Sequence, residues 1–354
     1  MKYALLLSGG VDSSTALAEL VSAGHEVHAY YLKVWLEDEL DYLGSCPWEE
    51  DLEFARNVCA QYQVPLSVVP LQLEYHEAVV SYTLEELKCG RTPSPDIFCN
   101  ERIKFGAFFS HLADNADDES RIASGHYAVL DRTDHGVLLR RSPDPVKDQT
   151  YFLSHLSQAQ LQRLEFPIGH HTKDQLRARA RALGVPSMDR RDSQGICFLG
   201  KIRYPDFIRH YLGEQDGPIV DRESGRELGR HNGYWFYTIG QRQGLRLGGG
   251  PWYVVGKDTA SNTVFVSHGD HAESRARDRL RIRDLHWTAA PLADDEVHVK
   301  LRHGPRLHRA QATWIDDDRL ELQLDEADRG IAPGQFAVMY RGDICLGSGT
   351  IEEG

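Results

Sequence analysis

The sequence predicts an α/β protein in which a doubly wound parallel sheet is followed by a small β-rich domain and a C-terminal β-barrel. An apolar strand at 3–7 leads through a Ser-Gly-Gly turn into a helix, which makes a strand-loop-helix unit. Strands at 27–34 and 66–70 flank a helix over 50–62, an alternation that is typical of a parallel sheet covered by helices. From residue 204 the chain changes to short strands and Gly-rich turns, which indicates separate β domains.

A chain of 354 residues exceeds the usual size of one hydrophobic core, so we expect several domains. Their expected bounds are 1–203, 204–272 and 273–354. The first domain continues through a helix at 104–113, a strand at 121–125 and a strand pair around 128–140. In the third, short apolar segments alternate with Asp, Gly and Pro turns, as in a small closed barrel.

The composition is that of a soluble globular protein, with 41% hydrophobic and 26% charged residues. No export signal and no membrane-spanning run is visible, so a cytoplasmic protein without membrane contact is expected. The formal net charge of -13 argues against a global positive field for nucleic acid. Bound RNA would need a local patch, and segment 173–209 offers nine basic against four acidic residues. A solvated helix face explains that segment equally well.

Residues 8–14 (Ser-Gly-Gly-Val-Asp-Ser-Ser) stand where the first strand ends and the first helix begins. Backbone N–H groups and the positive helix end can receive phosphate oxygens there, and Gly9 and Gly10 allow close approach. An acid beside phosphates, Asp12, suggests Mg²⁺. The segment lacks the Gly-Lys-Ser/Thr ending of a Walker loop, so transfer of the γ-phosphoryl group is not indicated.

Two cysteines stand in loops suited to chemistry. Cys99 follows Asp96 by three residues in a loop that two prolines stiffen, and Cys197 follows a polar turn with glycines on both sides. A lone cysteine in such a place is more often a small buried hydrophobe. Six cysteines in a chain with no export signal favour reactive or buried thiols over a disulfide framework.

The nucleotide loop resembles the PP-loop of the ATP pyrophosphatases, and the chain as a whole resembles the tRNA-specific 2-thiouridylases. Seven ordered blocks carry the second resemblance: 8–14, 93–100, 123–127, 147–152, 192–198, 237–242 and 251–257. The usual family loop has Asn where Ser94 stands and Met near Leu32, so base and adenine contacts are expected to differ in detail.

The resemblance implies ATP-dependent 2-thiolation of the wobble uridine of tRNA (U34), in which the base is adenylated and then receives sulfur from a cysteine persulfide. Cys197 would carry the persulfide, and Cys99 would be the partner thiol, leaving a Cys99–Cys197 disulfide for a donor pathway to reduce. Asp96 would act as general acid or base, although a loop carboxylate can also merely cap backbone amides. A cysteine desulfurase or a relay protein would donate the sulfur.

The resemblance also implies binding residues. Contacts with ATP and its Mg²⁺ are expected from Leu6, Leu7, Ser8, Gly9, Gly10, Val11, Asp12, Ser13, Leu32 and Gly125. Contacts with the flipped base or the tRNA are expected from Ser94, Pro95, Asp96, His126, Lys147, Asp148, Gln149, Arg302, His303 and Gln335.

Three rival interpretations stay open at this point. Cys99, Cys197 and a third ligand could hold a [4Fe–4S] cluster, since thiolates are the ligands of such clusters, although no CxxC motif supports it. Another PP-loop ligase could act on a small metabolite with both cysteines structural. A non-catalytic tRNA-binding protein would keep the basic segment and the barrel but has no need for the nucleotide loop.

Overall fold

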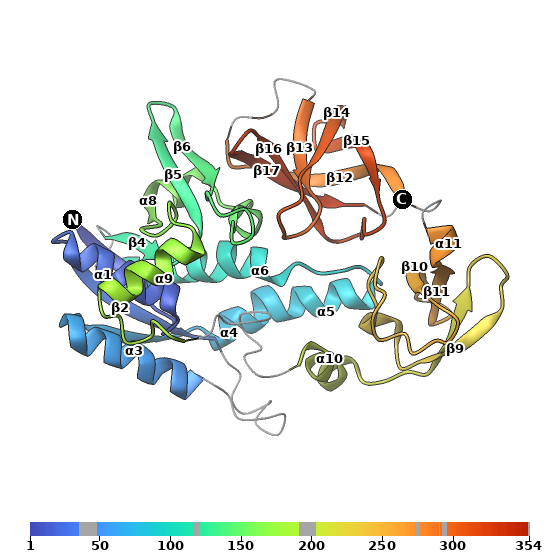
Figure 1. Cartoon of the computed structure of the whole chain (residues 1–354), viewed down its shortest axis with the longest axis horizontal. Coiled ribbons are helices and arrows are strands. Elements are labelled where there is room, and N and C mark those ends of the chain that lie inside the picture. The colour runs from blue at the N-terminus through green and yellow to red at the C-terminus, as the bar shows by residue number, and fades with distance from the viewer. Residues whose placement is uncertain are drawn as a thin grey trace.

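The computed structural model describes residues 1–34, 48–115, 120–190, 203–272, 276–289, 291 and 296–352. Figure 1 shows three lobes, with the N-terminal domain at the left, the barrel at the upper right and the central domain at the lower right. Of the helices among the described residues, none is long and apolar enough to cross a bilayer.

The first domain is built on a five-stranded parallel sheet in the order β3-β2-β1-β4-β7. Its strands are β1 (Lys2–Leu6), β2 (Glu26–Lys33), β3 (Leu66–Pro70), β4 (Arg121–Ser124) and β7 (Leu164–Glu165). The helices that precede or follow these strands along the chain include α1 (Val11–Ser22), α3 (Trp48–Tyr62), α7 (Phe108–Asp114), α8 (Gln158–Arg163) and α9 (Lys173–Ala182).

The strands of this sheet are apolar on both faces, as burial on both sides requires. On β1, Leu5 packs with α1 and α3 residues such as Leu17 and Leu52. The next residue, Leu6, points to the other face and joins a cluster that contains Phe108 of α7. Helices therefore cover both faces, and the predicted doubly wound fold is confirmed.

A helical arm not predicted from the sequence leaves this domain after β3 and crosses the middle of the molecule toward the central domain (Figure 1). It consists of α4 (Gln72–Tyr75), η2 (His76–Val80) and α5 (Ser81–Lys88), and the chain returns through α6 (Pro95–Phe98) and η3 (Cys99–Ala107) into α7. The helix expected at 104–113 thus begins earlier, at Pro95.

The central domain has a four-stranded sheet in the order β10-β11-β8-β9, in agreement with the predicted β-rich module. Its elements are α10 (Tyr204–Leu212), β8 (Gly217–Asp221), β9 (Glu227–His231), η5 (Tyr234–Phe236), β10 (Trp252–Asp258), β11 (Thr263–His268) and α11 (Gly269–Ala272). Tyr234 Oη donates to the carbonyl oxygen of Lys88 at 2.6 Å, which fixes this domain to the tip of α5.

The C-terminal domain is a closed antiparallel barrel, as predicted. Its strands are β12 (Arg277–Trp287), β13 (Glu296–Lys300), β14 (His308–Asp316), β15 (Arg319–Asp328), β16 (Phe336–Arg341) and β17 (Ile344–Ile351). Closure follows because β12 pairs with both β15 and β17. The sequence did not predict that the hairpin of β5 (Ala128–Thr133) and β6 (Gly136–Arg141) joins this sheet, with Cys345 opposite Leu139. The first domain and the barrel are therefore joined by strand pairing.

Candidate active site

The nucleotide loop, residues 8–14, joins the end of β1 to the start of α1. Gly9 has a φ of +75°, and a Cβ atom there would collide with the carbonyl oxygen of Asp51. Ser13 Oγ accepts a hydrogen bond from Ser8 N at 3.2 Å and lies 3.1 Å from Ser8 Oγ. A glycine turn at a helix N-terminus, packed this closely, is suited to receiving phosphate oxygens.

Gly125, just after β4, packs against the same loop. A Cβ atom at this position would lie 2.6 Å from Ser13 N, so only glycine allows the two segments to meet. Leu6, Leu7 and Val11 are core residues, so any contact of theirs with a nucleotide would come from the backbone. Leu32, the expected adenine contact, is half-buried near the end of β2.

Asp12 is the centre of a polar cluster that the sequence did not reveal. Its Oδ1 accepts hydrogen bonds from Tyr127 Oη at 2.9 Å and from Lys173 Nζ at 2.7 Å. The Lys173 side chain is only 11% exposed although it stands at the first turn of α9. A carboxylate and a mostly buried ammonium thus lie side by side at the start of α1, where a triphosphate would sit. Tyr127 belongs to one of the family blocks, whereas the sequence indicates for Lys173 only a place in the basic segment.

The residues around Asp12 limit how a metal could bind. The described residues contain no group of three or more His, Cys, Asp or Glu side chains that could hold a metal ion. Asp12 supplies one carboxylate, so Mg²⁺ would take most of its ligands from phosphate oxygens and water, as is usual for this ion. An iron–sulfur cluster gains no support within this part of the chain, and Cys197 lies outside the described residues.

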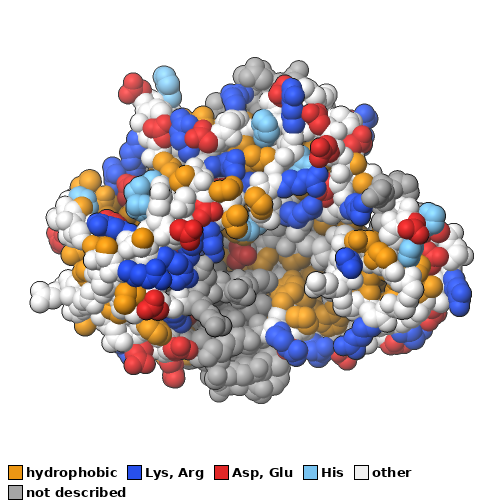
Figure 2. Space-filling view, in the orientation of Figure 1, with side chains coloured by type: hydrophobic (Ala, Val, Ile, Leu, Met, Phe, Trp, Pro, Cys, Tyr) orange, Lys and Arg blue, Asp and Glu red, His pale blue; other side chains and the backbone are white. Residues whose placement is uncertain are grey.

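Several cations of the basic segment 173–209 are paired with carboxylates, although some of them stay exposed. These pairs are Lys173 with Asp12, Arg179 with Glu19, Arg190 with Asp51, and Arg203 and Arg209 with Asp206. Figure 2 shows Lys and Arg side chains grouped over the region of α9, with acidic side chains at the edges of the group. Arg190 also donates to the carbonyl oxygen of Gly9 at 3.1 Å. Part of the segment therefore braces the nucleotide loop, and an RNA contact by its exposed cations stays a prediction.

The thiol loop, residues 91–99, enters α6 at Ser94, whose backbone N–H donates to Tyr82 Oη at 3.2 Å. Pro95 occupies the first helical position, where its missing N–H costs nothing. Asp96 is half-buried in the first turn, and Cys99, at the start of η3, is only 4% exposed. Access to this thiol is restricted, as a controlled sulfur transfer requires. Its expected partner Cys197, and hence the disulfide, lies outside the described residues.

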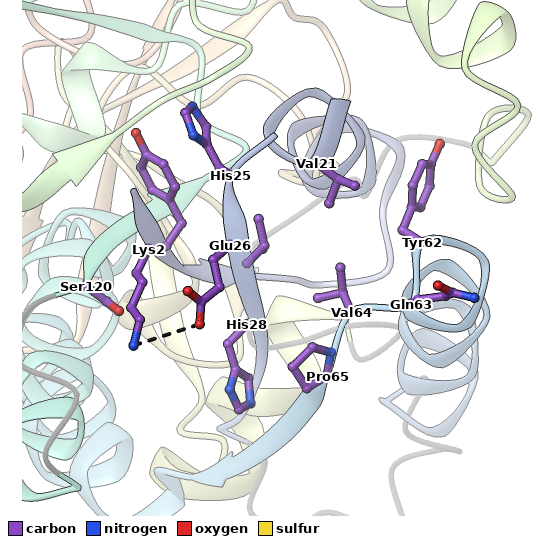
Figure 3. Close-up of a pocket in the computed structure, with 12 residues that line it drawn as sticks. Lys2, Val21, His25, Glu26, His28, Tyr62, Gln63, Val64, Pro65 and Ser120 are labelled. Atoms are coloured by element: carbon purple, nitrogen blue, oxygen red, sulfur yellow. Dashed lines mark ion pairs between the residues drawn. The ribbon is translucent and has the colours of Figure 1, made fainter. Parts of the chain in front are cut away.

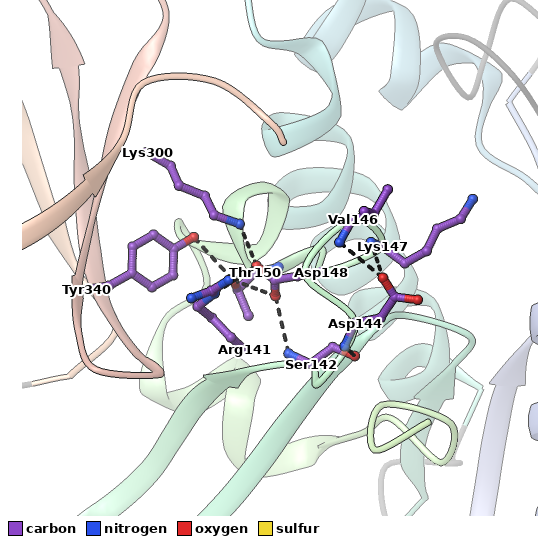
Figure 4. A network of polar contacts seen from close by, with 9 residues as sticks. All are labelled: Arg141, Ser142, Asp144, Val146, Lys147, Asp148, Thr150, Lys300 and Tyr340. Atoms are coloured by element: carbon purple, nitrogen blue, oxygen red, sulfur yellow. Dashed lines mark hydrogen bonds and ion pairs between the residues drawn. The ribbon is translucent and has the colours of Figure 1, made fainter. Parts of the chain in front are cut away.

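Asp148 lies in a buried polar network and not on the surface (Figure 4). Its Oδ2 pairs with Lys300 Nζ at 2.6 Å, and both side chains are fully buried. Thr150 Oγ1 donates to Asp148 Oδ1 at 2.9 Å and lies 3.1 Å from Tyr340 Oη. This carboxylate ties the first domain to the barrel, so the expected contact of Asp148 with tRNA stays a prediction that would fall to its backbone.

His126 is buried as well. Its ring lies 5.7 Å from that of Phe105 and 5.6 Å from that of Phe166, and Nδ1 lies 2.7 Å from Ser124 Oγ. Burial, with a smaller effect of the Lys104 charge, holds the pKa of His126 well below its usual value. The imidazole is therefore neutral and could contact RNA only as a neutral hydrogen-bonding group, and the expected contact of His126 with tRNA stays a prediction.

The other expected RNA contacts also stay predictions: Lys147, Gln149, Arg302, His303 and Gln335. Several of them already have partners within the protein, such as Gln149, whose Oε1 accepts from Tyr127 N at 2.9 Å. Arg302 forms an ion pair with Asp328 at 2.6 Å, and the His303 ring stacks on Phe152 at 4.6 Å. RNA would have to bind the exposed edges of these side chains or displace their partners.

A cavity of about 540 Å³ lies at the amino ends of the parallel strands (Figure 3). Lys2 and Glu26 form an ion pair of 3.8 Å at its wall, and Val21 and Tyr62 line it from the neighbouring helices. In an open parallel sheet ligands bind at the carboxyl ends of the strands, so this cavity is distinct from the nucleotide loop.

Known families match all three domains. A family described as tRNA methyl transferase HUP domain matches residues 1–201, one described as tRNA methyl transferase PRC-barrel domain matches 205–268, and one described as Aminomethyltransferase beta-barrel domain matches 277–351.

Full-length relatives carry a more specific name. The tRNA-specific 2-thiouridylase MnmA of Parabacteroides distasonis is 44% identical over 99% of both chains. That of Porphyromonas gingivalis is 43% identical over the whole of both. Among solved structures, an NMN synthetase from Francisella tularensis covers 60% of this chain and 77% of its own at 16% identity, but its TM-score of 0.33 is too low to support an argument.

Proposed function

Since the chain belongs to the tRNA-specific 2-thiouridylase family, we propose that it replaces the C2 oxygen of the wobble uridine of tRNA (U34) by sulfur, using ATP. The observation that carries the proposal is the match to relatives of this name over the full length of all three domains. A PP-loop ligase for a small metabolite would not need the second and third domains.

The nucleotide loop supports a role for ATP as the activator of the base. A uracil C2 oxygen is a poor leaving group, so its attack on the α-phosphorus, with loss of diphosphate, converts it into an adenylate. The N–H groups of the α1 start and the ammonium of Lys173 would face the phosphates. Asp12 would be a ligand of Mg²⁺ together with phosphate oxygens, whether or not it stays paired with Lys173.

The thiol loop supports sulfur transfer in two steps. The terminal sulfur of a Cys197 persulfide attacks C2, and AMP leaves with the C2 oxygen. The Cys99 thiolate then attacks the Cys197 sulfur, which releases 2-thiouridine and forms the Cys99–Cys197 disulfide. Two electrons from a thiol reductant regenerate both thiols, and a donor protein, a cysteine desulfurase or a relay, restores the persulfide.

Base binding would fall to the same loop. The target uridine must leave its stack before C2 can react. Ser94 and Pro95 begin α6 immediately before Asp96, so a flipped base bound there would lie within a turn of both the candidate acid–base and Cys99. Because the reaction needs tRNA and ATP together, we propose that the protein acts in the cytoplasm.

The test is mass spectrometry of nucleosides from unmodified tRNA incubated with the protein, ATP, Mg²⁺ and a persulfide donor, with and without oxygen. We expect 2-thiouridine from the wild type, and none from Cys197→Ser or Cys99→Ala, both of which should still bind ATP. Cys89→Ala, which removes an exposed thiol at the end of α5, is the matched control and should remain active. ATP cleavage without any thiolated nucleoside would refute the proposed substrate, and activity only without oxygen would favour a cluster.

A further inference from the structure

One loop of the barrel reaches into the first domain and touches the thiol loop. We call residues 331–336, which follow β15 and include the first residue of β16, the barrel loop. We propose that the barrel loop is a positioning element of the active site: it fixes the thiol loop, and through it Cys99 and the base-binding residues. The proposal rests on the function proposed above.

Two hydrogen bonds hold the barrel loop against the first domain, one of them from the thiol loop. Thr92 N donates to the carbonyl oxygen of Pro333 at 2.8 Å. Tyr151 Oη, from the first domain, donates to the carbonyl oxygen of Phe336 at 3.2 Å. Burial raises the pKa of Tyr151, so its hydroxyl stays protonated and remains a donor at physiological pH.

Aromatic packing carries the contact to the thiol itself. The Phe336 ring meets that of Phe98 edge to face, with 5.7 Å between ring centroids, and lies 5.0 Å from that of His155. Phe98 also packs edge to face on Tyr82 at 4.4 Å, and Tyr82 holds the N–H of Ser94. Phe98 directly precedes Cys99, so a displacement of the Phe336 ring would move the start of η3.

Gly334 is the point of closest approach. A Cβ atom there would lie 2.9 Å from Arg91 Cβ, 3.0 Å from the Thr92 carbonyl oxygen and 2.7 Å from a carboxylate oxygen of Glu86. Arg91 and Glu86 are themselves held by two hydrogen bonds of 2.8 and 2.6 Å. An added methyl group must therefore push the two loops apart.

On its other side the barrel loop is anchored to the barrel. Gly334 N donates to the carbonyl oxygen of Ile351 at 3.0 Å, and Ile351 N donates to that of Gln335 at 2.8 Å. Arg277 Nη2 donates to the carbonyl oxygen of Ile331 at 2.9 Å. Because these bonds fix the barrel loop to β12 and β17, a clash at Gly334 should displace the thiol loop and not the barrel.

The test compares Gly334→Ala with Gly342→Ala in the full-length protein. Both glycines have positive φ, +86° and +61°, so both substitutions impose similar backbone strain on the barrel, but nothing lies within 4 Å of a Cβ atom at Gly342. One readout is the rate at which iodoacetamide alkylates Cys99 without tRNA, mapped by mass spectrometry. The other is kcat and KM for 2-thiouridine formation.

We expect Gly334→Ala to speed Cys99 alkylation several-fold and to lower kcat by up to about 100-fold, the scale of a misplacement of about 1 Å, with KM for tRNA little changed. Gly342→Ala should match the wild type in both. Equal behaviour of the two variants would overturn the proposal. If Gly334→Ala does not fold, Tyr151→Phe replaces it as the test, because this variant removes only the donor to Phe336. Tyr151→Phe should show the same changes more weakly, and a Tyr151→Phe protein that behaves like the wild type would overturn the proposal. Failure of thiolation in the wild type would refute the proposed function but leave the alkylation result decisive.

Discussion

Replacing Lys300 by Met removes one partner of the buried ion pair that joins the barrel to the first domain. In the wild type Lys300 Nζ lies 2.6 Å from Asp148 Oδ2, and neither side chain is exposed. The variant keeps the length of the side chain but leaves the Asp148 carboxylate buried without its closest cation. Arg141 Nε, at 3.4 Å, and Thr150 Oγ1, at 2.9 Å, remain as partial compensation.

Breaking a buried pair on one side typically costs about 3–5 kcal/mol. Because Arg141 and Thr150 remain, we expect Lys300→Met to lose about 3 kcal/mol, at the low end of this range. Urea unfolding followed by tryptophan fluorescence measures the loss, with transitions fitted separately for separate domains. Arg230→Met, which breaks an exposed pair with Asp216 in the central domain, is the control and should leave the midpoint nearly unchanged.

The double variant Asp148→Asn/Lys300→Met decides whether electrostatics or packing is responsible. Without any buried charge the penalty of the unpaired carboxylate disappears, so the double variant should be more stable than the sum of the two single losses by about 2 kcal/mol or more. Strictly additive losses, or a loss below about 1 kcal/mol for Lys300→Met alone, would refute the view that this pair is a buried interdomain tie.

Two further predictions follow from the site. Lys173→Met should abolish ATP-dependent diphosphate release. Arg179→Met breaks another α1–α9 ion pair, away from the nucleotide loop, and should retain this activity. Loss of activity in both variants would indicate that only the packing of α9 matters. Acid should destabilise the protein as the pH falls through about 6.5, the unfolded-state pKa of histidine. Burial lowers the folded-state pKa values of His126 and His286, so below this pH the unfolded chain binds more protons than the folded one. His126→Gln should flatten this dependence of the unfolding midpoint on pH, and an unchanged slope would contradict the burial argument.

The sequence predicts the parts of this site that are set by neighbouring residues. The nucleotide loop follows from glycines placed between an apolar strand and a helix, and the thiol loop from two prolines around Ser94. Pairings between distant segments escape such reasoning. Asp12 and Lys173 are 161 residues apart, and nothing local in the basic segment indicates that this cation faces a carboxylate. Asp148 looks like a loop carboxylate suited to surface contacts until the tertiary structure places Lys300 beside it.

The same long-range pairings explain why a thiolation site would be built from more than one domain. The hairpin of β5 and β6 pairs with β17, the Asp148–Lys300 ion pair is fully buried at the junction, and the barrel loop bonds to Thr92. The sheet that carries the nucleotide loop and the barrel that carries Arg302 and His303 therefore cannot move independently at this junction. A tRNA bound on the barrel would then find its wobble base at a fixed distance from the thiol loop, so positioning of the base would come from the rigidity of the junction and would not require induced closure.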